Sequence, residues 1–313
     1  MKIFWALVFL CVPQFLLAQS LSPTPQPTES PKRELIGFGW MFTDDLIGDD
    51  HDRWQTSSLN LSWILARGWS GDLPETFGDV IEIRAYTQMI SPEDLVTPNP
   101  QDRQYAGILS LGAYTHFQRR SAQFTVGAEL VAVGPQTGVD SLQTEFHKLI
   151  GSTPPSRAIL DDQISNDFYP TVVAEIGREW DLGRNTRLRP FASVRAGDET
   201  LARVGMDVTF GQVGRSELLI RDKITGQRYR SMRIGPKGVS GVFGFDAAYL
   251  ADSAYIPNSG EVSLKHERYR ARLGLNWEAK YGTLFYGATY LSEEFNQQPE
   301  GQVVGSLSFK ISF

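Results

Sequence analysis

Apolar and polar residues alternate along most of the chain from Glu34 onward. A period of two places successive side chains on opposite faces of a β-strand. In residues 268–277, three arginines alternate with tyrosine, alanine and leucine side chains. The pattern predicts about twelve antiparallel strands of roughly ten residues, which is typical of a bacterial outer-membrane barrel. The predicted strands cover residues 34–43, 54–66, 80–89, 104–117, 122–133, 168–180, 186–196, 201–210, 242–250, 268–277, 281–291 and 302–313.

The distribution of polar residues favours a membrane barrel over a soluble β-sandwich. A sandwich turns its charged face to water, whereas a membrane barrel encloses a polar lumen and turns an apolar band to lipid. Aromatic residues near the strand ends fit the interfacial girdles of such a barrel. They are Trp40, Trp54, Trp63, Tyr86, Tyr105, Trp180, Tyr249, Trp277, Tyr281 and Tyr290. We therefore predict an all-β transmembrane barrel, and a monomer because a closed barrel has no open edge.

The last predicted strand supports this fold. Val303, Leu307, Phe309, Ile311 and Phe313 share one face of it. A strand that ends in phenylalanine resembles the carboxy-terminal signal that outer-membrane barrels present to the barrel-insertion machinery. We expect that machinery to be a partner of the chain through Phe313.

A periplasmic amino terminus would fix the side of every loop. Segments 43–53, 90–103 and 134–167 then lie outside the cell, and the short turns at 118–121 and 182–185 lie on the periplasmic side. Residues 211–241 break this pattern, because periplasmic turns of such barrels are short. Either the strand count is wrong in this region or the barrel carries an unusual insertion on its inner side. This long segment is basic, and we expect it to be a solvated loop.

The alternation stops in residues 133–151, where apolar residues recur at helical spacing. Asp140, followed by Gln143, forms the capping-box pattern of a helix start, and Gly151 is a helix stop signal. The sequence predicts one short amphipathic helix in the third outer loop, with His147 near its end. The apolar residues of this helix are Val139, Leu142, Phe146, Leu149 and Ile150.

The first residues are typical of an export signal. Lys2 precedes an apolar run that ends at Leu17, and we expect cleavage near Ala18. Residues 19–33 are rich in proline, serine and threonine, which predicts a disordered leader. The predicted organisation is a signal peptide at 1–18, a leader at 19–33 and a barrel at 34–313, located in the outer membrane of a Gram-negative cell.

Composition and motifs exclude several classes of function. The chain has 30 Lys and Arg against 36 Asp and Glu, and this acidic balance argues against a nucleic-acid partner. Its single cysteine, Cys11, lies in the predicted signal peptide, so thiol catalysis is excluded for the mature chain. No later segment reaches the roughly 18 apolar residues of a membrane-spanning helix. The G-x-S-x-G motif of serine hydrolases is absent from the sequence.

The predicted topology brings polar residues from three distant segments to the outer rim. Asp44 and Asp45 end the first strand, Thr56 and Ser57 open the second, and His147 lies on the helix. A histidine can act as a general base near neutral pH. Aspartates can bind Ca²⁺, which polarises an ester carbonyl. Each group also has a common structural role, since helical histidines and solvated aspartate turns are frequent.

Four stretches resemble the LpxR family of outer-membrane lipid A 3′-O-deacylases. FTDD at 42–45 stands where the family has Asn-Asp, and DRWQTSSL at 52–59 is similar to Asp-Arg-Tyr-Tyr-Thr-Asn-Gly-Leu. DRQYAG at 102–107 looks like Asp-Arg-Pro-Tyr-Ala-Gly. The helical segment 133–151 is similar to the family's Gly-Pro…Gln…His-Lys-x-Ile-Gly pattern. The resemblance extends over nearly all of residues 34–313.

The resemblance implies Ca²⁺-dependent ester hydrolysis at the outer-leaflet rim, with lipid A or lipopolysaccharide as the substrate. It implies that His147 is the general base that activates water, and that Thr56 and Gln143 belong to the catalytic site. It places Asp44 at the Ca²⁺ site; Asp45, beside it in the aspartate cluster that ends the first strand, is the second candidate metal ligand.

Three departures from the family pattern concern the substrate. Thr43 stands where the family has asparagine, and Ser57 begins the pair that replaces Asn-Gly; both positions are candidate substrate contacts. The second outer loop, SPEDLVTPNPQ, is acidic and has no lysine to bind the phosphates of lipid A. These departures count against lipid A as the substrate, but the rim residues His147, Asp44 and Thr56 and the family resemblance make a Ca²⁺-dependent lipid A deacylase the leading hypothesis. The alternatives are a non-catalytic barrel, either a narrow pore or a lipid-binding structural protein, and a barrel phospholipase.

Overall fold

The computed structural model describes residues 32–232, 237–257, 261–280 and 282–311. Arg33–Phe313 form one compact unit, and the account below concerns this unit. The predicted signal peptide, nearly all of the leader and the terminal Phe313 lie outside the described residues, so the proposals about export and barrel insertion stay predictions.

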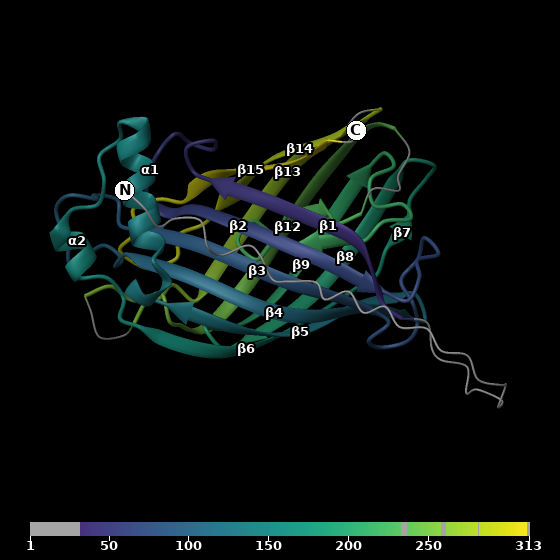
Figure 1. Cartoon of the computed structure of the whole chain (residues 1–313), viewed down its shortest axis with the longest axis horizontal. Helices are drawn as coiled ribbons and strands as arrows, with labels where there is room; N and C mark the ends of the chain where they lie inside the picture. Colours follow the sequence, from purple (N-terminus) through teal and green to yellow (C-terminus); the bar gives the residue numbers. More distant parts are fainter. Residues whose placement is uncertain (1–31, 233–236, 258–260, 281, 312–313) are drawn as a thin grey trace, which may run out of the picture. The chain divides into compact units, whose positions relative to one another are not determined.

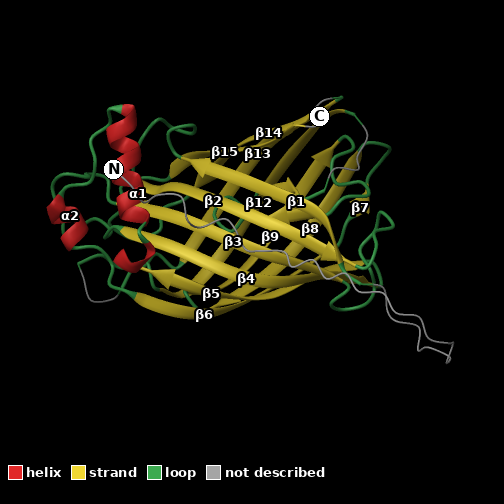
Figure 2. Ribbon diagram, viewed as in Figure 1, coloured by secondary structure: helices red, strands yellow, loops and turns green. Residues whose placement is uncertain are grey.

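Within the described residues, twelve long antiparallel strands close into a barrel (Figures 1 and 2). The ring closes where β1 (Glu34–Asp44) pairs with β15 (Gln302–Ile311) and where β6 (Asp167–Gly177) pairs with β8 (Thr186–Ala196). The predicted fold and strand number are confirmed. The other wall strands are β2 (Trp54–Ala66), β3 (Val80–Ser91), β4 (Ala106–Arg119), β5 (Ala122–Val133), β9 (Glu199–Phe210), β12 (Gly238–Ser253), β13 (Glu267–Ala279) and β14 (Gly282–Leu291). The two-residue strand β7 (Trp180–Asp181) pairs only with β8.

The wall is polar on its inner face and apolar on its outer face. In β13, Arg270 and Arg272 are buried, whereas Leu273, Leu275 and Trp277 are exposed. This is the reverse of a soluble sandwich and matches a barrel whose outer band contacts lipid. None of the described helices is long and apolar enough to cross a membrane.

Three of the aromatic residues assigned to interfacial girdles are buried, so that part of the prediction is wrong. Trp54 packs with Leu250, Ile256, Leu264 and Phe295 in a hydrophobic cluster of the outer loops. Tyr86 lies in the lumen, where its hydroxyl donates to Gln88 Oε1. Tyr105 packs below the outer helices.

The outer end of the barrel carries the helices (Figure 1). These are η1 (Pro135–Thr137), α1 (Val139–Ile150) and α2 (Arg157–Asp161). The wall allows α1 to approach at Gly107, where an added Cβ would lie 2.6 Å from Thr137 Oγ1 and 2.8 Å from Val139 Cβ. Val139 then packs against Met89 and Tyr105. The glycine at position 107 of β4 therefore leaves the space in which α1 begins.

The ends of α1 differ in part from the expectation. The helix ends at Gly151, which has a φ of 77° and donates its N–H to His147 O, as predicted. Its N-cap is Gly138, with a φ of 68°, rather than Asp140. The positive φ starts the helix at Val139, so Asp140 lies in the first turn and accepts a hydrogen bond from Ser141 N. The side chains of Phe146 and Ile150 lie outside the described part of the chain.

The long segment after β9 is not a solvated loop. It enters from the end opposite α1 and forms a hairpin of β10 (Leu219–Arg221) and β11 (Arg228–Arg230) inside the barrel. Ile220 and Tyr229 are buried, and the Tyr229 hydroxyl lies 2.8 Å from Ser62 Oγ of the wall. The strand count was therefore correct, and the extra residues fill the lumen. This arrangement argues against the open-pore alternative.

Candidate active site

A row of three residues on neighbouring strands forms the wall side of the site. Asp44 on β1 pairs in register with Ser57 on β2, and Ser57 pairs with Met89 on β3. Residues that face each other across a ladder project from the same side of the sheet. Met89 packs against Val139 of α1, so Asp44 and Ser57 share the outer face on which the helix lies.

The helix α1 turns its polar side toward the wall. Gln143 and His147 are only 2% and 5% exposed, whereas the apolar Leu142 and Leu149 are 62% and 83% exposed. A helix on a water-soluble core would show the opposite distribution. The buried side of α1 is therefore built around polar chemistry, and part of its apolar side is directed away from the barrel.

His147 has two well-defined partners at its ring nitrogens. Its Nδ1 lies 2.8 Å from the carbonyl oxygen of Thr153, and its Nε2 lies 3.2 Å from Asp52 Oδ2. Gln143, one helical turn earlier, places its Nε2 3.5 Å from the same imidazole nitrogen. The structure thus joins the helix to the first outer loop at the predicted histidine.

Several buried polar atoms around His147 have no hydrogen-bond partner among the described residues. They are Asp52 Oδ1, Tyr105 Oη, Gln143 Oε1 and Thr144 Oγ1. Buried polar groups are nearly always hydrogen-bonded to protein or water. A group of such atoms around one histidine indicates a place that binds water, an ion or a polar part of a substrate.

The other predicted residues are not all brought to His147. Thr43 lies on the lumen face of β1, opposite Ser58 in register, and its hydroxyl is 3.0 Å from Ser306 Oγ. Thr56 is buried near the strand irregularity at the start of β2, 2.6 Å from Ser91 Oγ. The site therefore combines Asp44, Ser57, Gln143 and His147, while Thr43 is turned away from it by the alternation of the strand.

The family model of the outer membrane protein LpxR matches residues 3–313 of the chain. The chain belongs to the LpxR family. The solved LpxR from Salmonella typhimurium is similar to it over 88% of this chain and 100% of that one, with 15% sequence identity and a TM-score of 0.71. At that identity the similarity shows the barrel fold. Family and fold together make the protein an outer-membrane β-barrel.

Other solved barrels are less similar to this LpxR-family chain. The β domain of the Bordetella autotransporter BrkA is 12% identical, with coverage of 91% of this chain and 100% of that one and a TM-score of 0.39. The KdgM porin is 5% identical, with coverage of 89% and 99% and a TM-score of 0.39. The comparison with curated proteins gives no match.

The carboxylates of this candidate site are suitable ligands for a cation, but they are too few to hold one by themselves. The described residues contain no group of three or more His, Cys, Asp or Glu side chains that could hold a metal ion. Asp44 Oδ1 accepts a hydrogen bond from Leu46 N, and Asp45 Oδ2 accepts one from Arg53 N. A Ca²⁺ ion, which takes six to eight oxygen ligands, would need amide, backbone or water oxygens besides carboxylates. The unpartnered Gln143 Oε1 is an oxygen of this kind.

Burial controls the charge of the aspartates at this rim. It raises the pKa of the Asp45 carboxyl to about 9, although the hydrogen bond from Arg53 N opposes the rise, and the negative charges of Asp44 and Asp52 add to it. Burial also raises the pKa of Asp52, while His147 lowers it. The carboxyl groups at this rim are therefore held toward their neutral form, chiefly by burial.

Two residues of this candidate site were not predicted from the sequence. Asp52 contacts the histidine directly, and Tyr105 lies close enough for the charges of Asp140 and Asp52 to raise the pKa of its hydroxyl, beyond the rise due to burial. Both residues belong to the stretches that carry the family resemblance, Asp52 in DRWQTSSL and Tyr105 in DRQYAG. That location was the available signal, but the contacts depend on how the loops fold back.

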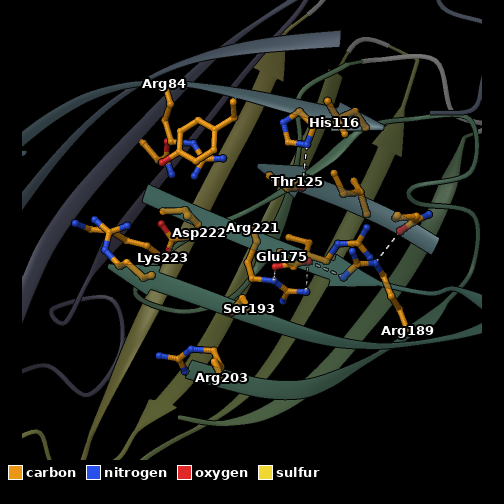
Figure 3. Close-up of a pocket in the computed structure, with 18 of the residues that line it drawn as sticks. Arg84, His116, Thr125, Glu175, Arg189, Ser193, Arg203, Arg221, Asp222 and Lys223 are labelled. Atoms are coloured by element: carbon orange, nitrogen blue, oxygen red, sulfur yellow. Dashed lines mark hydrogen bonds and ion pairs between the residues drawn. The ribbon is translucent and has the colours of Figure 1, made fainter. Parts of the chain in front are cut away.

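The lumen of this LpxR-family barrel holds a polar cavity of about 500 Å³ between the hairpin and the wall (Figure 3). Several of its charged side chains pair with each other. Arg189 and Arg221 both donate to Glu175, at 2.8 and 2.7 Å, and Arg221 also donates to Asp207. His116 Nδ1 lies 3.0 Å from Thr125 Oγ1. The contacts of Arg221, which lies on β10, hold the hairpin against β6 and β9 of the wall.

Proposed function

We propose that this protein is a hydrolase that cleaves a 3′-linked acyl ester of lipid A in the outer leaflet. The proposal rests on membership of the LpxR family and on one structural observation. His147 on the buried side of α1, the Asp52 carboxylate and several polar atoms that have no hydrogen-bond partner among the described residues lie together at the outer face of the barrel, and the other side of α1 exposes leucines. Such a place gives a membrane-embedded ester access to a polar reaction centre.

In this proposal His147 is the general base. The carbonyl of Thr153 fixes the proton on Nδ1 and leaves Nε2 to accept a proton from water. Hydroxide then attacks the ester carbonyl, so no acyl-enzyme forms. Gln143 lies against the same nitrogen and would orient the water, and Ser57 would contact the substrate on the wall side.

Asp44 is the main candidate ligand for a Ca²⁺ ion, because it is partly exposed and its side chain shares the outer face with Ser57. Asp45 is almost fully buried, and Arg53 N already binds one of its carboxylate oxygens. The unpartnered Gln143 Oε1 would add a second oxygen ligand. When bound, the ion would supply positive charge for the oxyanion of the ester carbonyl.

A phospholipase activity is the second candidate, and one observation favours it. Arg53 is paired with Glu93 and Glu300, at 3.3 and 2.9 Å, and Arg103 is paired with Glu294. These arginines flank the site in sequence, but their charges are already compensated by protein carboxylates. A substrate with fewer phosphates than lipid A would need less positive charge at this rim.

The deciding experiment is mass spectrometry of lipid A from cells without other deacylases. Wild-type protein should remove one 3′-linked acyl chain, and His147→Ala should not. The matched control is His266→Ala, which changes a histidine of another outer loop. Unchanged lipid A, with wild-type protein correctly inserted, would disprove the lipid A activity. Release of acyl chains from glycerophospholipids in the same cells would then support the second candidate.

A further inference from the structure

The contact between Asp52 and His147 indicates where the protons of the two side chains lie. A carbonyl oxygen can only accept a hydrogen bond, so the 2.8 Å contact with Thr153 O places a hydrogen on His147 Nδ1. In the neutral ring Nε2 then holds a lone pair. Asp52 Oδ2 lies 3.2 Å from that nitrogen, and two lone pairs would repel unless one proton lies between them.

We propose that Asp52 and His147 form one general-base unit, in which Asp52 holds the attacking water and stabilises the protonated imidazole. The inference rests on the proposed ester hydrolysis and adds a residue to it. Asp52 Oδ1 is buried and has no hydrogen-bond partner among the described residues. It belongs to the carboxylate that contacts Nε2, so a water bound to it lies beside the base.

The proton balance of this unit is complete. The pair reacts after it has lost the proton between Nε2 and Oδ2. The bound water then transfers one proton to Nε2, where the charge of Asp52 stabilises the imidazolium, and the hydroxide forms a bond to the ester carbonyl carbon. The bond from that carbon to the alkoxide oxygen then breaks, and the leaving alkoxide takes the proton back from the pair. The products are a fatty acid and an alcohol, and no further reactant is needed.

The surroundings of the pair favour a shared proton. The carboxyls of Asp44 and Asp52 both act on His147, and negative charge beside the ring stabilises the protonated imidazole. The titratable groups that act on this region from β1, the first outer loop, the start of β4 and α1 are Asp44, Asp45, Tyr105 and Asp140.

The test uses the full-length protein in detergent micelles with purified lipid A. Asp52→Asn should lower kcat by about 100-fold or more, with KM within about twofold of wild type. Asp52→Glu should restore part of kcat. The matched control is Asp161→Asn, the same chemical change at an exposed position of α2, and it should leave kcat unchanged. An Asp52→Asn variant that keeps kcat within about threefold of wild type would overturn the inference.

A second readout does not depend on activity. The chain has four histidines, so the imidazole signal of His147 can be assigned in ¹⁵N-labelled protein by its loss in His147→Ala. At neutral pH, loss of the proton shared with Asp52 in Asp52→Asn should move the Nε2 signal of His147 toward the chemical shift of an unprotonated nitrogen. An unchanged Nε2 signal would overturn the inference even if no ester is hydrolysed, and a shifted signal with inactive wild-type protein would refute only the proposed function.

A third result separates a general base from a metal ligand. If Asp52 bound Ca²⁺, the Asp52→Asn variant would need more Ca²⁺ for half-maximal activity and would recover at high Ca²⁺. The inference requires that saturating Ca²⁺ does not restore kcat. Recovery by Ca²⁺ would therefore overturn it.

Discussion

At the residue scale, the side-chain direction of Thr43 determines whether its replacement of the family asparagine affects catalysis. Its hydroxyl contacts Ser306 in the lumen, on the face opposite Asp44. We expect Thr43→Val to keep the rate of acyl release within about twofold of wild type, because the side chain does not reach His147. The variant should lose about 1 kcal/mol of unfolding free energy, since Ser306 loses a buried partner.

Acyl release by mass spectrometry and the thermal midpoint of the same preparation check this expectation for Thr43. The matched variant is Ser57→Ala, which changes a hydroxyl on the outer face beside Asp44. It should affect the rate more than the midpoint. A tenfold loss of rate in Thr43→Val at unchanged midpoint would show that residue 43 serves the site after all.

The role of Asp44 gives a second prediction at this scale. A Ca²⁺ site with few protein carboxylates depends strongly on each one. We expect a Ca²⁺ chelator to abolish acyl release and added Ca²⁺ to restore it. Asp44→Asn should raise the Ca²⁺ concentration for half-maximal activity by roughly tenfold or more. Isothermal titration of Ca²⁺ into both proteins measures the change, and equal affinities would remove Asp44 from the site.

The residues also show where sequence reasoning ends. His147, Gln143 and Asp44 could be predicted because each lies in a motif of the family, and the structure places them close together. Asp52 lies in a motif too, yet its role follows only from the 3.2 Å contact with the imidazole. Sequence spacing contains no information about which side chain of one loop meets which side chain of another.

At the element scale, the strands were predictable and the hairpin was not. The period of two is a local property, so each wall strand could be recognised by itself. The strands β10 and β11 have three residues each, too short for a period to be visible. Their burial comes from long-range contacts such as Arg221 with Glu175. The capping-box prediction failed for a different, local reason. Gly138 adopts a positive φ and serves as the N-cap, so the helix begins at Val139, before Asp140.

The exposed leucines of α1 lead to a prediction for this element. Leu142 and Leu149 cover no described protein core, so we expect the double change to serine to leave the thermal midpoint within about 2 °C of wild type. The apparent KM for lipid A in vesicles should rise, because apolar area buried in lipid is lost. Hydrolysis of a short-chain ester in solution should not change. Equal rates on vesicles would show that α1 does not contact the lipid phase.

At the scale of the whole molecule, the lumen hairpin closes the interior of the barrel, while the candidate site lies on the outer face. The site lies on the outer face at one end, and the hairpin enters from the opposite end and fills the interior. Ion pairs hold it there, since Arg221 bridges Glu175 of β6 and Asp207 of β9, both at 2.7 Å. The barrel is thus arranged as a closed scaffold for a rim site rather than as a passage.

Replacing residues 214–236 by a short glycine-containing turn should therefore open the barrel without removing the rim site. We expect ion conductance in planar bilayers, which the wild type should lack, because the polar lumen would fill with water. The ester hydrolysis proposed above should persist at a reduced level. Arg221→Gln provides the milder variant, because it keeps the hairpin but removes one of the two arginines that pair with each of the buried carboxylates Glu175 and Asp207. It should lower the thermal midpoint clearly while conductance stays absent. Conductance in the wild-type protein would contradict this arrangement, and so would a deletion variant that folds but remains closed.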